Sequence, residues 1–280
     1  WMTKVYSQKL KNLSFPFKTF IKFDSNGFEV IYNNRITDTF PNRFNVTDPD
    51  VIDFYKIPAD KISVCYQSCN TAFAVPIEEA EKKRIQNKYN LPAHFLLSVG
   101  SIIERKNLLS ICQAMALQKK EDRLPLVVIG NGSAYKLRVK SFIQREGLEK
   151  EVIFLSDQPG IKNDPSFLTA IDLPAIYQCA SALLYPSSFE GFGIPVLEGL
   201  FSRIPVLTSN QSCLPEAGGP GAFYVDPYKP EQIVEQLHLI TTDKEFVAKK
   251  IELGRQHAQQ FSPLETATSV MNVYKELITE

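Results

Sequence analysis

The chain has 280 residues, 44% of them hydrophobic and 22% charged, which is ordinary for a folded globular protein and enough for one large domain or two. Its 31 basic and 31 acidic side chains balance, which excludes a general nucleic-acid-binding field and leaves only a local basic patch open. No apolar run approaches the roughly 18 residues of a transmembrane helix, and no signal peptide is visible.

The five cysteines are odd in number and scattered along the chain. Cys65 and Cys69 lie four apart, but there is no second pair and the chain has only three histidines. We interpret them as reduced, mostly buried thiols of a cytoplasmic protein rather than as metal ligands. The sequence begins Trp1-Met2, which we interpret as a cut end rather than a natural start.

The first 60 residues, rich in Phe, Asn, Lys and Thr, give little pattern. Asp48-Pro49 is typical of a helix start and predicts a short helix through Tyr55. A strand is expected at Lys61–Gln67, followed by a charged helix at Ile77–Tyr89 that Leu91-Pro92 ends.

From His94 onward, short apolar strands alternate with helices. We predict strands at 95–100, 124–129, 151–155, 182–185, 205–207 and 222–225. We predict helices at 108–117, 135–146, 196–201, 230–241, 244–261 and 264–277, and a short one capped by Asp172 that runs through Ala180. The last begins at the capping box Ser262-Pro263-Leu264-Glu265.

This alternation predicts an α/β fold, a Rossmann-like doubly wound parallel sheet covered on both faces. Ligands of such sheets bind at the carboxyl ends of the strands. Gly100, Gly130 and the turn at Glu190 all follow strand ends, so we expect them to converge on one cleft.

The most informative motif follows the predicted strand that ends at Tyr185. Glu190 and Glu198 lie eight positions apart, and between them stand Gly191, Gly193 and Pro195, a pattern typical of a turn followed by a helix N-terminus. Free N–H groups there suit a phosphate, and the carboxylates can accept hydrogen bonds from sugar hydroxyls. The motif favours a nucleotide-sugar site, the alternative being a surface turn with two solvated acids.

A second motif runs from Gly100 to Asn107. Arg105 and Lys106 could neutralise a diphosphate just before a helix, where cations oppose the helix dipole and are a poor structural choice. The alternative is a solvated basic helix start.

Two weaker motifs lie further along the chain. Gly130–Ser133 lacks the third glycine of a dinucleotide fingerprint and is equally consistent with a plain turn. The polar loop Ser209–Glu216 could line the same cleft or be an ordinary connection. The three histidines, His94, His238 and His257, are interpreted as structural, and no Ser-His-Asp arrangement, nucleophile elbow or zinc spacing is present.

In order and spacing, these motifs over about residues 50–280 resemble the retaining glycosyltransferases of the group 1, or family 4, type. The matching segments are Gly100-Ser101, Glu104–Asn107, Val128–Gly130, Asp172–Tyr177, Glu190–Pro195 with Glu198, Ser209-Asn210 and Leu214–Glu216. The resemblance implies a GT-B architecture of two Rossmann-like domains, the C-terminal one binding the donor. It further implies transfer of a hexose with retention, by front-face attack, in polysaccharide or glycoconjugate synthesis.

The resemblance also implies roles for individual residues. Arg105 and Lys106 would hold the donor diphosphate, and Glu190 would contact the sugar hydroxyls. Backbone N–H groups at Phe192 and Gly193 would lie near sugar and phosphate, while Glu198 would accept from the ribose. The candidate catalytic residues are Glu190, Lys106 and Arg105. The candidate donor-binding residues are Gly100, Ser101, Gly130, Phe192, Gly193, Ile194 and Glu198.

The implied partners are a UDP- or GDP-linked sugar and a glycan or lipid-linked acceptor, with no nucleic acid. No metal or cofactor is implied, because cations and the helix terminus would stabilise the leaving group. Peripheral membrane association is common among proteins of this type.

Three segments are expected: a shortened acceptor-side region at 1–75, a donor-binding domain at 76–262 and a crossover helix at 263–280. The first has no histidine and no Gly-rich loop, and Ser101 stands where some members carry arginine. A non-catalytic fragment that binds nucleotide-sugar, or a partner subunit, is therefore the alternative function. A nicotinamide dehydrogenase or a sugar-nucleotide epimerase is disfavoured, because the fingerprint and a catalytic acid–histidine set are missing.

Overall fold

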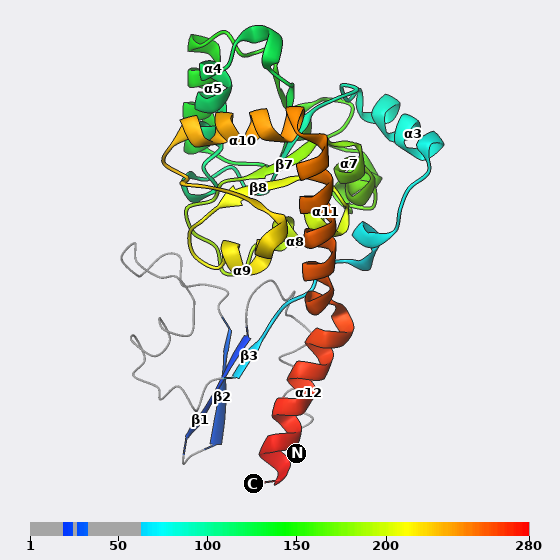
Figure 1. The fold of residues 1–280 in the computed structure, drawn as a ribbon, viewed down its shortest axis with the longest axis vertical. Coiled ribbons are helices and arrows are strands. Elements are labelled where there is room, and N and C mark those ends of the chain that lie inside the picture. Colours follow the sequence, from blue (N-terminus) through cyan, green and yellow to red (C-terminus); the bar gives the residue numbers. More distant parts are fainter. Residues whose placement is uncertain (1–18, 25–26, 33–62, 280) are drawn as a thin grey trace.

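The computed structural model describes residues 19–24, 27–32 and 63–279 (Figure 1). Its main body contains a sheet of six strands in the order β6-β5-β4-β7-β8-β9, with every neighbouring pair parallel. These strands are β4 (Leu96–Val99), β5 (Leu126–Ile129), β6 (Val152–Phe154), β7 (Ala182–Tyr185), β8 (Val206–Ser209) and β9 (Phe223–Val225). The predicted parallel α/β sheet is confirmed.

Helices lie around this sheet, and the last of them extends away from it to the C-terminal end of the chain (Figure 1). They are α3 (Glu79–Tyr89), α4 (Leu108–Leu117), α5 (Ala134–Arg145), α6 (Pro165–Leu168), α7 (Leu173–Cys179), α8 (Ile194–Phe201), α9 (Leu214–Gly218), α10 (Pro230–Thr242), α11 (Lys244–Ala258) and α12 (Pro263–Thr279). Short 3-10 turns, among them Glu104–Lys106 and Gln259–Phe261, connect several of them.

The sheet has a hydrophobic core on each face, because successive side chains of a strand point to opposite sides. Leu96 belongs to one core and Leu97 to the other, and Leu183 and Leu184 divide in the same way. Helices α3, α7, α8 and α9 pack into the first core, and α4, α5 and α10 into the second. Near-continuous apolar strands are the sequence signature of a sheet buried in this way.

The strand order reverses between β4 and β7. From β4 the chain builds outward through β5 and β6 on one side, then returns and builds through β7, β8 and β9 on the other. Loops leaving neighbouring strands in opposite directions open a crevice at the carboxyl ends, where ligands of open α/β sheets bind.

A second, antiparallel sheet lies beside the C-terminal helix (Figure 1). Its strands are β1 (Thr19–Asp24), β2 (Gly27–Tyr32) and β3 (Ser63–Cys65), in the order β2-β1-β3. The sequence predicted a strand around β3 but no hairpin before it. The helix expected from Asp48 to Tyr55 lies outside the described residues.

Helix α12 starts where the capping box predicted, since the Glu265 N–H donates to Ser262 Oγ at 3.2 Å. It then runs alongside β3 (Figure 1). The single helix predicted at 244–261 is wrong at its end, because α11 stops at Ala258 and a 3-10 turn carries the chain to Phe261.

Asp172 stands at the N-terminus of α7, as predicted, but its side chain makes no capping bond. Its buried carboxylate accepts instead from Lys88 Nζ at 2.7 Å and from the Tyr89 hydroxyl at 2.8 Å. The tertiary contact with α3 therefore replaces the local one. The loop predicted at 209–216 is partly helical: α9 begins at Leu214, and Pro215 lies in its first turn.

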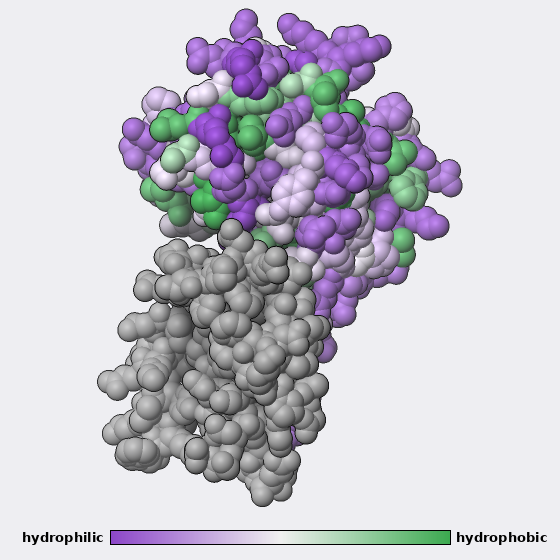
Figure 2. All heavy atoms as spheres, turned by 90° about the vertical axis from the view of Figure 1, so that its left-hand side faces the viewer, coloured by the Kyte–Doolittle hydropathy of each residue, from purple (hydrophilic) through white to green (hydrophobic). Residues whose placement is uncertain are grey.

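On the face shown in Figure 2, hydrophilic side chains are interspersed with smaller apolar patches over the coloured part of the molecule. Among the helices that the structure describes, none combines the length and the hydrophobicity needed to cross a bilayer.

Gly130, at the end of β5, has a steric reason to be glycine. Its φ is +151°, and a Cβ would lie 1.9 Å from the carbonyl oxygen of Gly100. Gly130→Ala should therefore lower the free energy of unfolding by about 2–4 kcal/mol in urea denaturation. Gly147→Ala is the control, because its φ of +68° is strained but no atom lies within 4 Å; we expect about 1 kcal/mol there. Equal losses would refute the steric argument.

Candidate functional site

Two loops from the centre of the sheet meet at its carboxyl edge. One follows β4 and holds the turn Glu104–Lys106; the other follows β7 and leads to Glu190. The Arg105 carbonyl accepts from the Ser188 N–H at 2.8 Å, and Ser187 Oγ lies 2.8 Å from the same carbonyl oxygen. The two strongest sequence motifs are thus joined at the point where the strand order reverses.

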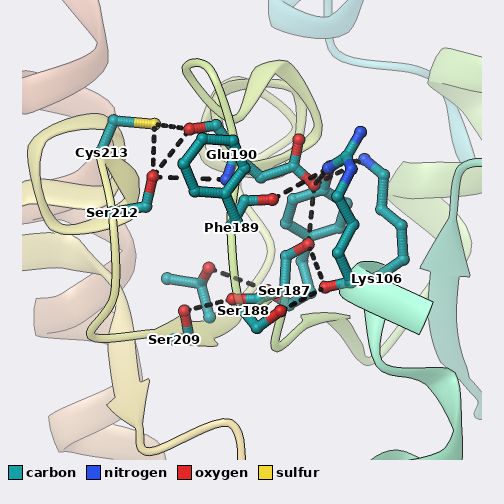
Figure 3. A network of polar contacts seen from close by, with 11 residues as sticks. Lys106, Ser187, Ser188, Phe189, Glu190, Ser209, Ser212 and Cys213 are labelled. Atoms are coloured by element: carbon teal, nitrogen blue, oxygen red, sulfur yellow. Dashed lines mark hydrogen bonds and ion pairs between the residues drawn. The ribbon is translucent and has the colours of Figure 1, made fainter. Parts of the chain in front are cut away.

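Glu190 lies at the centre of this junction and is 4% exposed. Its Oε1 atom is contacted by four groups: Arg105 Nη1 at 2.7 Å, Lys106 Nζ at 2.8 Å, the Tyr185 hydroxyl at 2.8 Å and Ser187 Oγ at 2.7 Å. Figure 3 labels Glu190, Lys106 and Ser187. Two cations and two hydroxyls therefore converge on one carboxylate oxygen.

Charge pairing decides the protonation state of Glu190. Burial alone would raise the pKa of its carboxyl, but the charges and hydrogen bonds of Lys106 and Arg105 hold the pKa below its usual range. Burial lowers the pKa of Lys106, against the opposing attraction of Glu190. The carboxylate of Glu190 thus faces two cations.

Tyr185 and Lys106 are in direct contact. The Lys106 ammonium donates to the Tyr185 hydroxyl and lies 4.4 Å from the centre of its ring. Tyr185 is buried, and burial raises the pKa of its phenol well above the usual value. The hydroxyl therefore remains a neutral donor to Glu190. From the sequence, Tyr185 was predicted only as the last residue of a strand.

The loop after β8 holds the backbone of Glu190 from the other side (Figure 3). Ser212 Oγ donates to the Glu190 carbonyl at 2.7 Å and accepts from its N–H at 3.3 Å. Cys213 Sγ donates to the same carbonyl at 3.1 Å, and Ser209 Oγ donates to the Ser187 carbonyl at 2.5 Å. This loop, which the sequence left undecided, supports the site.

Glu198 lies one turn into α8, and its Oε2 accepts from the Tyr177 hydroxyl at 2.7 Å. Burial raises the pKa of Glu198, while the Tyr177 hydrogen bond and the charge of Lys106 oppose the rise. Its own negative charge in turn acts on Lys106 and Tyr185. Both glutamates therefore act on the charge of Lys106.

The turn between the glutamates combines a buried side chain with a helix N-terminus. Phe192 is 1% exposed, and its ring belongs to the hydrophobic core. Gly193 has φ +104° and precedes α8, which starts at Ile194. The first N–H groups of a helix have no partner within it and attract anions.

The remaining predicted residues lie around the same edge. Gly100 has φ +127°, and a Cβ there would lie 3.5 Å from Lys106 Nζ. Ser101 is exposed, and the Gly130 N–H donates to Ser156 Oγ at 2.9 Å. Asn107, the last residue of the motif that begins at Gly100, donates from Nδ2 to the Pro227 carbonyl at 2.5 Å and so holds the start of α4. The structure therefore brings the predicted residues to one edge and adds Tyr185, Tyr177, Ser212 and Cys213 to them.

These groups are chemically suited to one kind of ligand. Two cations and a helix N-terminus attract a phosphorylated group. Two carboxylates beside them accept hydrogen bonds from hydroxyl groups.

Comparison with known proteins agrees with this chemistry. Residues 79–257 match the family described as glycosyl transferases group 1. The chain is 29% identical over 231 residues to the O-antigen chain mannosyltransferase B of Escherichia coli, covering 81% of this chain and 58% of that protein.

Solved structures confirm the fold. A glycosyltransferase from Rickettsia africae superposes with a TM-score of 0.69 at 21% identity, over 81% of this chain and 60% of that one. Anabaena Alr3699/HepE, solved in complex with UDP, superposes with a TM-score of 0.68 at 15% identity, over 83% of this chain and 61% of that one. The chain thus spans about three fifths of the length of each of these relatives. Its match to the family profile extends over well more than half of its own length, and the chain belongs to the glycosyl transferases group 1.

Proposed function

We propose that the cleft binds a nucleotide-sugar and that the chain is the donor-binding part of a retaining glycosyltransferase. Residues 76–262 would form the donor domain, residues 1–75 the acceptor-side region, and residues 263–280 the helix that crosses back. The observation that carries the proposal is the Glu190 carboxylate paired with Arg105 and Lys106 in the turn before α8.

The donor diphosphate would take the place of one carboxylate oxygen among the cations. Arg105 and Lys106 neutralise Glu190 in the structure, and a diphosphate offers them a higher negative charge. Glu190 would then turn to the sugar hydroxyls, still held by Tyr185 and Ser187.

The same cations would act in the chemical step. As the bond from sugar to diphosphate breaks, negative charge develops on the leaving group, and a cation fixed beforehand stabilises that charge without reorganisation. Lys106 is 16% exposed on its side chain, so little water weakens this effect. Glu198 would hold the ribose.

Support for the donor class comes from relatives. One is named a mannosyltransferase of an O-antigen chain, and another was solved with UDP. We therefore propose a hexose carried on UDP or GDP, and a glycan or lipid-linked acceptor in polysaccharide or glycoconjugate synthesis. Retention, by front-face attack, follows from the resemblance to retaining enzymes.

The experiment is to incubate the whole chain with UDP-glucose or GDP-mannose and simple acceptors, and to follow the first-formed anomer by NMR. An α-linked product from an α-linked donor is expected. A β-linked product would refute retention, and donor binding without turnover would favour a non-catalytic subunit. Lys106→Met should slow this transfer, and Lys136→Met is its matched control. Lys136 is also a mostly buried lysine in an ion pair, with Asp157 at 2.5 Å, and this pair involves none of the proposed donor-binding residues.

A further inference from the structure

Three aromatic rings from distant parts of the chain pack together at the turn Glu190–Gly193, called the donor turn below. Tyr66 follows β3, Phe192 lies within the turn, and Phe261 lies between α11 and α12. Tyr66 stacks on Phe192 with ring centres 5.7 Å apart and planes at 27°. Phe261 meets Tyr66 at 5.3 Å and Phe192 at 5.2 Å, both edge-to-face.

A closed set of contacts holds Tyr66 in this place. Its hydroxyl donates to the Glu216 carboxylate on α9. The Glu216 carbonyl is 2.9 Å from His257 Nε2, and the His257 ring meets Phe261 edge-to-face at 5.4 Å. The Tyr66 ring is therefore fixed by its face, its edge and its hydroxyl.

The place of Phe192 in the chain gives this packing a consequence. Phe192 stands two residues after Glu190 and directly before Gly193, and its ring is fully buried. The Phe192 ring is enclosed by Tyr66 and Phe261, so a change in their packing acts on the backbone of Phe192 and of the residues beside it. The ring packing thus bears on the position of the turn Glu190–Gly193.

Two of the rings lie where the chain passes between the three-stranded sheet and the part of the molecule that contains the six-stranded sheet. Tyr66 lies on the first crossing, directly after β3, and Phe261 on the second, directly before α12 (Figure 1). The donor turn is therefore packed against both crossings, whereas Arg105 and Lys106 belong to a loop held by the main body.

We propose that Tyr66 is a positioning residue for the donor sugar: its ring fixes Phe192 and so holds the turn Glu190–Gly193 where it meets the sugar. This inference rests on the proposed function. It separates two parts of donor recognition, because the Tyr66 ring packs on the turn Glu190–Gly193, whereas Arg105 and Lys106 belong to the loop after β4. Loss of the ring should affect recognition of the sugar more than recognition of the nucleotide.

The test measures the dissociation constants of UDP, GDP, UDP-glucose and GDP-mannose by calorimetry on the whole chain, with hydrolysis kinetics of the sugar that binds. Tyr66→Ala should weaken binding of the nucleotide-sugar about tenfold, because Phe192 loses a stacked ring, and should change binding of the bare nucleotide less than about twofold. Tyr66→Phe keeps the ring and should restore sugar binding.

Two further variants keep the result interpretable. Tyr66→Leu fills most of the space without a stacking face and should behave like Tyr66→Ala even if the latter folds poorly. Phe246→Ala removes an edge-to-face contact, with Phe223 at 5.9 Å, outside the cluster and should change neither constant.

The outcomes separate the two claims. Unchanged sugar binding in Tyr66→Ala and Tyr66→Leu, or equal weakening for nucleotide and nucleotide-sugar, overturns the positioning role and leaves the proposed function intact. A wild-type chain that binds UDP or GDP but no sugar conjugate, or none of the four, overturns both.

Discussion

Replacing Glu190 with alanine should reduce sugar transfer by about 10²–10³-fold, the usual cost of removing one preorganised polar group from a transition state. The variant should at the same time bind UDP or GDP as tightly as the wild type or more tightly. The physical reason is that Glu190 neutralises Arg105 and Lys106 at 2.7 and 2.8 Å, so its removal frees both cations for a diphosphate. Kinetics and calorimetry on the same sample measure the two effects.

Opposite changes in rate and nucleotide affinity would not follow from simple unfolding. Asp172→Asn is the control: its carboxylate is also buried and paired with a lysine, Lys88 at 2.7 Å, but it lies where α3 meets α7. We expect a loss of stability there without a loss of transfer per folded molecule. An unchanged transfer rate in Glu190→Ala would exclude Glu190 from the reaction.

Lys106→Met should weaken nucleoside diphosphate binding by about 10- to 100-fold, because a hydrogen bond to a charged group is worth about 1.5–3 kcal/mol. Transfer should fall further, because the leaving diphosphate carries more charge in the transition state than in the ground state. Methionine keeps the length of the side chain and its packing on the Tyr185 ring, so the change is chiefly one of charge.

Lys106→Arg tests geometry at constant charge. The lysine ammonium contacts the Glu190 carboxylate at 2.8 Å and lies 4.4 Å from the centre of the Tyr185 ring, and a guanidinium is broader and planar. We expect the nucleotide affinity of Lys106→Arg to lie between those of the wild type and Lys106→Met. Full activity in Lys106→Arg would show that the cluster supplies charge alone, and unchanged nucleotide affinity in Lys106→Met would exclude Lys106 as a diphosphate ligand.

Much of this fold could be predicted because its signals are local. Apolar strands such as Leu126–Ile129 and helices of regular period require only a window of sequence, and their alternation implies a parallel sheet. The hairpin of β1 and β2 was missed because its strands mix charged and apolar residues, and the sheet is completed only by β3, far along the chain.

The site divides in the same way. Glycines, a proline and two glutamates at fixed spacing indicated the turn before α8, since those residue types are tied to backbone geometry. Which side chains contact Glu190 depends on the meeting of separate loops, so neither its ion pair with Arg105 nor the support from Ser212 could be inferred from spacing. Tyr177 and Tyr185 were assigned to core elements by pattern, and only the structure shows their hydroxyls on the two glutamates.

Asp172 shows the converse error. An aspartate before Leu173-Pro174 is typical of a helix cap, but Lys88 and Tyr89 offer its carboxylate a charged and a neutral donor at once. A tertiary ion pair outweighs a single backbone hydrogen bond in such a buried place.

The most direct test of the account is calorimetric titration of the whole chain with UDP-, GDP- and ADP-sugars, repeated on Lys106→Met and on the matched variant Lys136→Met. The account predicts saturable binding of a UDP- or GDP-sugar that Lys106→Met weakens about 10- to 100-fold and that Lys136→Met leaves unchanged. Binding of no nucleotide-sugar by the wild type, or binding that Lys106→Met does not alter, would contradict it.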